Sequence, residues 1–83
     1  MKITKQAVAA KIGAFLRQEI TTEDLVDWAE GAVREGEFQS AGVARIVARL
    51  GVADVRAFGL GWEDCQGLLK QLGYAAQVEI VVA

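Results

Sequence analysis

Apolar residues recur every three or four positions in four stretches of the chain, which is the spacing of one face of an α-helix. Each stretch would bury one side of its helix against the others. The pattern predicts a mostly helical protein, with about four short helices in a single small domain over residues 1–83. The four predicted stripes are Val8, Ile12, Phe15 and Leu16; Leu25, Trp28, Ala29 and Ala32; Val43, Ile46, Val47 and Leu50; and Cys65, Leu68, Leu69 and Leu72.

Residues typical of helix ends flank these stripes. Thr4 precedes the first stripe, and its side-chain oxygen can accept hydrogen bonds from first-turn amides. Thr21 precedes the second stripe, with Asp24 three residues later at the position of a capping box. Residues 52–61 are ambiguous, because Asp54 could cap a single helical turn or residues 55–60 could be extended. Glycines that can end a helix follow three of the stripes, at Gly36, Gly51 and Gly73.

The last seven residues, Gln77–Ala83, change to the two-residue period of a β-strand, with Val78, Ile80 and Val82 on one face. A strand that is rich in β-branched residues and unpaired promotes aggregation, so we expect it to have a partner. Lys2–Thr4 and Val55–Phe58 are the candidates within the chain. We favour such an internal pairing, a minimal β element that makes the fold α+β at most. Pairing with another chain, or packing on the helices, remains the alternative.

Composition narrows the class of protein. The hydrophobic fraction of 53% excludes a disordered chain and leaves apolar surface that another chain could cover. The net charge of −2 gives no general attraction to nucleic acid or anionic lipid. No apolar stretch approaches the roughly 18–20 residues of a membrane span. With a single cysteine, no disulfide can form within the chain. We therefore expect a cytoplasmic protein that does not enter a membrane.

The sequence offers little for catalysis. Histidine is absent, which removes the commonest general base and the commonest zinc ligand. Cys65 lies on an apolar stripe, where it is expected to act as a small buried side chain. The segment Gly59–Asp64, GLGWED, lacks the third glycine and the preceding strand of a phosphate-binding loop. We expect no enzymatic activity and no cofactor.

Two exposed features could bind a partner. Glu23, Asp27 and Glu30 share one face of the second predicted helix. That face is either simply solvated or an acidic docking surface, since a helix face alone cannot build the oxygen cage of a metal site. Trp62 begins the fourth predicted helix outside its apolar stripe. It either folds back over the preceding connector or serves as a half-exposed interface anchor.

Arg45 and Arg49 lie four residues apart on the third predicted helix and support an alternative. The third and fourth helices could form a winged-helix-like nucleic-acid binder with the terminal strand as its wing. The fourth helix, however, would begin with Glu63 and Asp64, where contact with phosphates favours basic residues. Nucleic-acid binding is therefore the less favoured hypothesis.

The segment IGAFLRQEITTEDLVDWAEGA, Ile12–Ala32, resembles the opening helical hairpin of many small bacterial proteins. Its TTEDLVDWA part is similar to segments of helical immunity proteins, which inhibit a neighbouring toxin. The resemblance covers about a quarter of the chain and assigns no site residue. The leading hypothesis is a small bacterial interaction module that binds another protein or a second copy of itself. Its candidate partner-binding residues are Glu23, Asp27, Glu30, Trp62, Val78, Ile80 and Val82.

Overall fold

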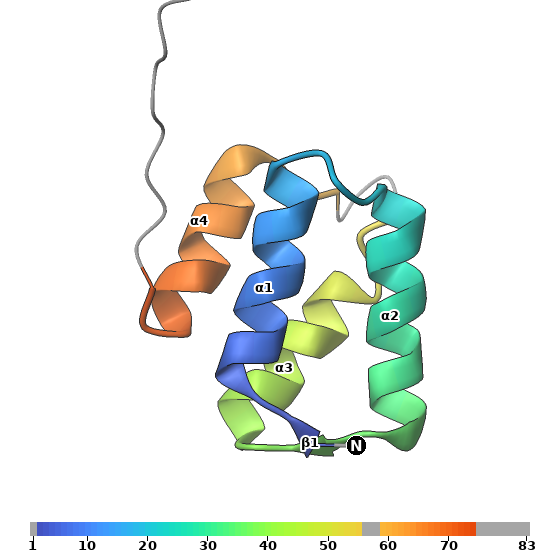
Figure 1. Ribbon diagram of the computed structural model, residues 1–83, viewed down its shortest axis with the longest axis vertical. Helices are drawn as coiled ribbons and strands as arrows, with labels where there is room; N and C mark the ends of the chain where they lie inside the picture. The colour runs from blue at the N-terminus through green and yellow to red at the C-terminus, as the bar shows by residue number, and fades with distance from the viewer. Residues whose placement is uncertain (1, 56–58, 75–83) are drawn as a thin grey trace, which may run out of the picture.

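The computed structural model describes residues 2–55 and 59–74, and within these ranges the protein has four helices and one pair of very short strands. The mostly helical fold predicted from the apolar stripes is therefore confirmed. The elements in chain order are β1 (Lys2–Ile3), α1 (Lys5–Leu16), α2 (Thr22–Glu35), β2 (Glu37–Phe38), α3 (Ala41–Leu50) and α4 (Trp62–Gln71) (Figure 1).

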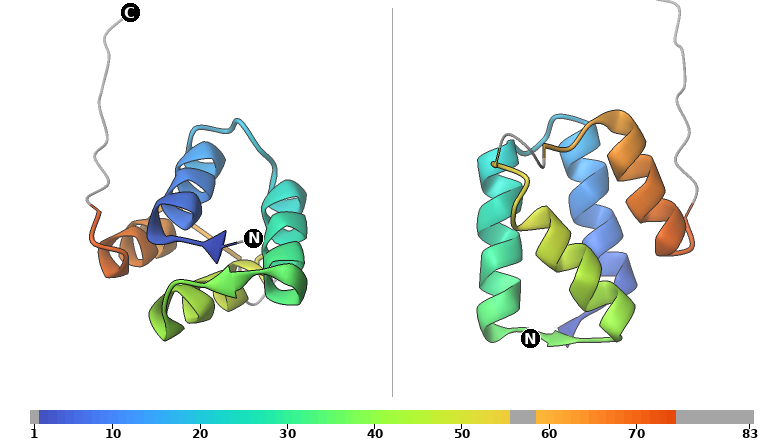
Figure 2. Two further views of the ribbon diagram at one scale, coloured as in Figure 1. Left: turned by 60° about the horizontal axis from the view of Figure 1, so that its bottom comes forward. Right: turned by 180° about the vertical axis from the view of Figure 1, so that it is seen from behind.

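α1 and α2 form a helical hairpin, and α3 and α4 pack against it. α1 and α2 run in opposite directions and are joined by a short link, as their spacing in the sequence predicts (Figure 1). α3 packs mainly against α2, and α4 packs mainly against α1. Seen from behind, α3 lies between α2 and α4 (Figure 2). One side of α3 therefore borders α2, and its other side borders α4.

The β element contains a strand that the sequence did not predict. β1 pairs in parallel with β2, with Lys2 opposite Glu37 and Ile3 opposite Phe38. Lys2–Thr4 is a candidate strand in the sequence, but its partner in the structure is the segment after α2. A strand of two residues is too short to show a two-residue period, so pattern alone could not identify β2.

Most residues of the two strands predicted near the C-terminus and after α3 lie outside the described ranges. Gln77–Ala83, with Val78, Ile80 and Val82, lies outside the described residues. Of the other candidate strand, Val55–Phe58, only Val55 is described, and its amide donates a hydrogen bond to the carbonyl of Val52. Residues 51–54 form turns directly after α3, and Val55 lies at a bend.

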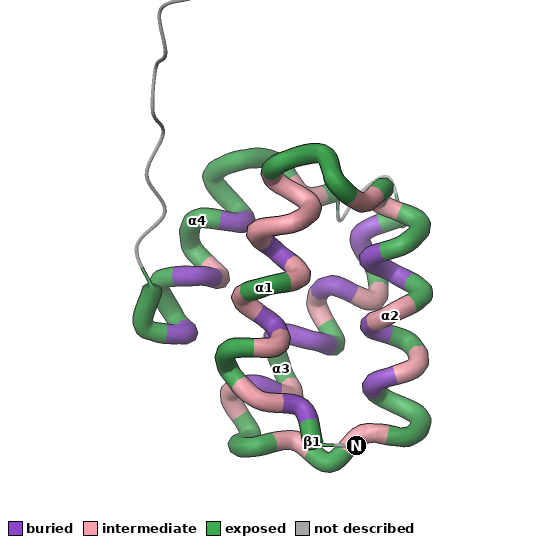
Figure 3. Tube along the Cα trace, in the orientation of Figure 1, coloured by how far each residue is buried: buried purple, intermediate pink, exposed green. Residues whose placement is uncertain are grey.

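All four apolar stripes contribute to one core (Figure 3). Each inward residue predicted for α3 is buried, whereas Phe15 and Leu16 near the end of α1 are only half-buried. Trp28 is also half-buried, and the ammonium nitrogen of Lys11 lies 5.8 Å from the centre of its ring, within the range of a cation–π contact. The core residues are Ile3, Val8, Ile12, Leu25, Ala29, Ala32, Val43, Ile46, Val47, Leu50, Cys65, Leu69 and Leu72.

The predicted caps are present. The amide of Ala7 donates to the hydroxyl of Thr4, at 3.1 Å. At the start of α2, the amide of Asp24 donates to Thr21 Oγ1 at 3.1 Å, and the amide of Thr21 donates back to Asp24 Oδ2 at 3.0 Å. The bond from the Thr21 amide lowers the pKa of Asp24 below its usual value, and the Thr21 hydroxyl adds to this effect. Hydrogen bonds to a carboxylate favour its charged form. Gly61 has no side chain to cap α4, but its amide donates to Asp64 Oδ2 at 3.0 Å.

α1 and α4 end in the same way but with different residues. After α4, Gly73 has a φ of +90°, and the amide of Tyr74 donates to the carbonyl of Leu69 at 2.9 Å. After α1, Gln18 has a φ of +61°, and the amide of Glu19 donates to the carbonyl of Ala14 at 2.9 Å. This left-handed conformation suits glycine and strains a residue with a Cβ atom. The backbone of Gln18 is therefore strained at the end of α1, whereas that of Gly73 is not strained at the end of α4.

Replacing Gln18 by glycine is therefore expected to stabilise the protein. The left-handed strain costs about 1–2 kcal/mol, and the extra freedom of glycine in the unfolded chain returns about half of it, which leaves a gain of about 0.5–1 kcal/mol. Urea denaturation measures the change. Gly73→Ala is the matched control and should destabilise by a similar amount. Equal stability of both variants and the wild type would contradict the assignment of strain to Gln18.

Candidate interaction surfaces

An apolar groove lies between α2 and α3. Its apolar rim is Val33 of α2, which is 55% exposed, and Val52 just after α3, which is 37% exposed. Ala48 and Gly51 also line the groove, and neither carries more than a methyl group as a side chain. We call this the α2–α3 groove; its lining residues are Glu30, Val33, Arg34, Ala48, Gly51 and Val52.

The acidic residues predicted to share a face of α2 are all exposed. Glu23, Asp27 and Glu30 are four and then three residues apart, so they form one row along the helix. The row ends at the α2–α3 groove, because Glu30 belongs to both. Within residues 2–55 and 59–74, no group of three or more acidic or cysteine side chains is arranged to hold a metal ion.

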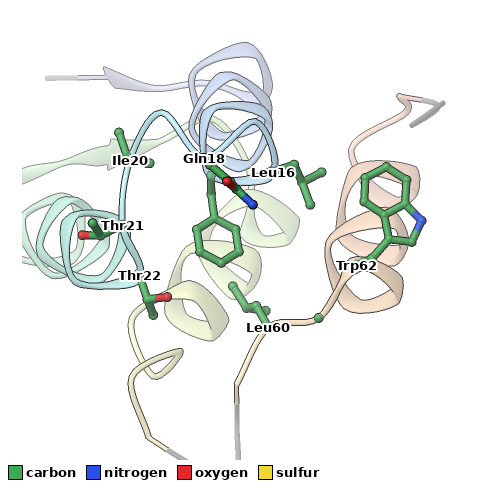
Figure 4. Close-up of a pocket in the computed structure, with 9 residues that line it drawn as sticks. Leu16, Gln18, Ile20, Thr21, Thr22, Leu60 and Trp62 are labelled. Carbon is green, nitrogen blue, oxygen red and sulfur yellow. The ribbon is translucent and has the colours of Figure 1, made fainter. Parts of the chain in front are cut away.

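Trp62 belongs to a different surface. It is 39% exposed and lies at the edge of a hollow next to the start of α4. In Figure 4, Ile20, Thr21 and Thr22 line the opposite edge, and Leu60 lies between. Trp62 lines this hollow, whereas Glu30 of the acidic row lines the α2–α3 groove. The candidates that lie within the described residues, the acidic row and Trp62, are thus divided between two surfaces.

Arg45 and Arg49 do lie together, in a groove between α3 and α4. Ile46 and Leu68 give this α3–α4 groove an apolar floor, and Gln71 completes it. The guanidinium of Arg49 is partly engaged, since its Nη2 donates to the carbonyl of Gly59 at 3.4 Å.

The first turn of α4 carries two exposed carboxylates, Glu63 and Asp64. They stand where a DNA-reading helix would contact phosphates, so nothing in this geometry strengthens the winged-helix alternative. Nucleic-acid binding through Arg45 and Arg49 stays a prediction.

Cys65 is fully buried in the core. Burial raises the pKa of its thiol, and the neighbouring carboxylate of Asp64 raises it further, against a smaller opposing effect of Arg49. Because the thiolate is the reactive form, this thiol is poorly suited to nucleophilic attack near neutral pH. The structure places Cys65 as the small buried side chain that its position on the stripe predicts.

The α2–α3 groove was not identified from the sequence. Val33 lies outside the buried stripe of α2, and Val52 lies in the segment that the sequence left ambiguous. The available signal was a β-branched residue on an otherwise polar side of a predicted helix. The signal does not show that α3 would place a second valine beside it.

No helix in the described ranges is both long enough and apolar enough to cross a membrane. In comparisons with known proteins, no family model, no curated protein and no solved structure matches this chain significantly. The likeness of Ile12–Ala32 to immunity proteins therefore remains a resemblance of one helical hairpin.

Proposed function

We propose that this protein is a small interaction module that binds another protein chain at the α2–α3 groove. The observation that carries the proposal is that two exposed valines, Val33 and Val52, line one groove together with the small residues Ala48 and Gly51. Covering apolar surface contributes about 25 cal/mol for each Å² removed from water. A partner that fills this groove would gain that free energy without any rearrangement of the core.

The charged rim supports the same proposal. Single exposed apolar residues are common on protein surfaces, but an apolar patch bordered by polar residues is typical of an interaction site. Glu30 and Arg34 stand on the rim of the groove and carry opposite charges. Charges in such positions set the orientation of a partner and discriminate against wrong ones.

The proposal includes no catalytic step. The one thiol is buried and protonated, and the exposed carboxylates of α2 form a row along one solvated face. The row instead extends the charged rim of the groove by two turns of α2, from Glu30 through Asp27 to Glu23.

Site-specific photo-crosslinking tests the proposal. A photoreactive amino acid in place of Val52 is expected to crosslink a defined partner in cells that make the full chain. The same amino acid in place of Gln66, an exposed residue of α4, is the matched control and should give no such product. Val33→Asp should remove the product at position 52, because a charge in the groove opposes burial. Identical products at both positions, or products unaffected by Val33→Asp, would contradict binding at the groove.

A further inference from the structure

The surface around the α2–α3 groove carries three carboxylates and Arg34 on its α2 side, and Arg45 on its α3 side. The acidic row of Glu23, Asp27 and Glu30 lies along α2. On α3, Arg45 is exposed. It lies three residues before Ala48, which lines the groove, so the two residues are neighbours on the helix surface.

Arg45 stands on the far side of the groove from the acidic row. It lines the α3–α4 groove, which places it on the side of α3 away from α2 (Figure 2). Across this face the order is therefore acidic row, apolar groove, arginine.

We propose that the partner bound at the α2–α3 groove is a second copy of this chain, related to the first by a two-fold axis that runs along the groove. A rotation about such an axis exchanges the two sides of the face. It places the acidic row of each copy over Arg45 of the other and brings the two apolar grooves together. Each favourable charge contact then occurs twice, as in any isologous interface. This inference rests on the proposed function of the groove.

Other occupants match the charges less well. A basic segment would satisfy the acidic row but would face Arg45, and an acidic segment would satisfy Arg45 but face three carboxylates. A two-fold axis across the groove, instead of along it, would place acidic row against acidic row. Of these arrangements, only a second copy about the axis along the groove sets carboxylates of each chain against an arginine of the other at both ends. The net charge of −2 is also small enough to give little general repulsion between copies.

A charge swap tests the inference by sedimentation of the full chain over a range of concentrations. Glu30→Lys would place an ammonium group over the partner's arginine at both ends of the dimer, and Arg45→Glu would place two carboxylates together at both ends. Each variant alone is expected to self-associate about tenfold more weakly than the wild type. An equimolar mixture should recover association. In the mixed dimer, the new ammonium group of the first variant faces the new carboxylate of the second, while the other contact remains native.

The outcomes separate this inference from the proposed function. Wild-type protein that stays monomeric throughout overturns the dimer, while groove-dependent crosslinking to a different protein would still support binding at the groove. A wild-type dimer whose two variants are not rescued by mixing overturns the proposed axis. Val33→Asp should abolish association by itself. Circular dichroism of each variant shows whether it remains folded, and a variant that has lost its fold is replaced in the test by the milder Val33→Ser or Glu30→Gln.

Discussion

Replacing Leu25 by alanine is expected to destabilise the protein by about 2–5 kcal/mol, the range for a buried leucine that leaves a cavity. Leu25 is fully buried on the inner face of α2, where it belongs to the core formed by all four helices. A domain of this size typically has only about 3–5 kcal/mol of net stability. We therefore expect the variant to be largely unfolded or close to its unfolding midpoint in the absence of denaturant. Urea denaturation followed by circular dichroism measures the effect.

The matched control for Leu25→Ala lies two turns further along the same helix. Val33→Ala removes apolar atoms from a side chain that is 55% exposed, so its effect on the free energy of unfolding should stay within about 0.5 kcal/mol. The same substitution should weaken binding at the α2–α3 groove. A Leu25→Ala variant as stable as Val33→Ala would show that the inner face of α2 has been assigned wrongly.

Replacing Gly36 by alanine should destabilise the protein by about 1–3 kcal/mol, as expected when atoms are forced into a filled space. A Cβ atom at this position would lie 2.6 Å from the carbonyl oxygen of Ala32 and 2.6 Å from Cγ1 of Ile3. Neither neighbour can move easily, because one is helix backbone and the other is a buried side chain of a paired strand. Thermal and urea denaturation would both report the loss.

Gly31→Ala is the control for Gly36→Ala and should have the opposite sign. Gly31 lies within α2, the helix that ends just before Gly36. Nothing lies within 4 Å of the position that its Cβ atom would take. Alanine there gains helix propensity and should stabilise the protein by about 0.5–1 kcal/mol. If both substitutions changed stability in the same direction, the close approach of Ile3 to Gly36 would be contradicted.

The features that sequence predicted correctly are those decided by neighbouring residues. The Thr21–Asp24 capping box depends on a spacing of three residues, and the inner face of α3 depends on a period that ten residues already display. Both could be identified without knowing where any other part of the chain lies.

The features that sequence missed depend on distant parts of the chain. β2 exists because β1 lies beside it, and its two residues carry no strand pattern of their own. Gln18 adopts a conformation in which glycine is expected, so its type gave no warning. The α2–α3 groove requires Val33 and Val52 to be brought together by the packing of two helices. The exposure of the acidic row and of Trp62 was predictable, but their separation onto two surfaces was not.

The parallel pairing of β1 with β2 also sets an order for folding during synthesis. Ile3 leaves the ribosome before its strand partner Phe38, which follows 35 residues later. Lys5 likewise precedes by 34 residues the side chain of Gln39, which accepts a hydrogen bond from the Lys5 amide. β1 therefore cannot pair with β2 until both helices of the first hairpin, α1 and α2, have been synthesised. Because β1 precedes α1 and β2 follows α2, their pairing joins the two open ends of that hairpin.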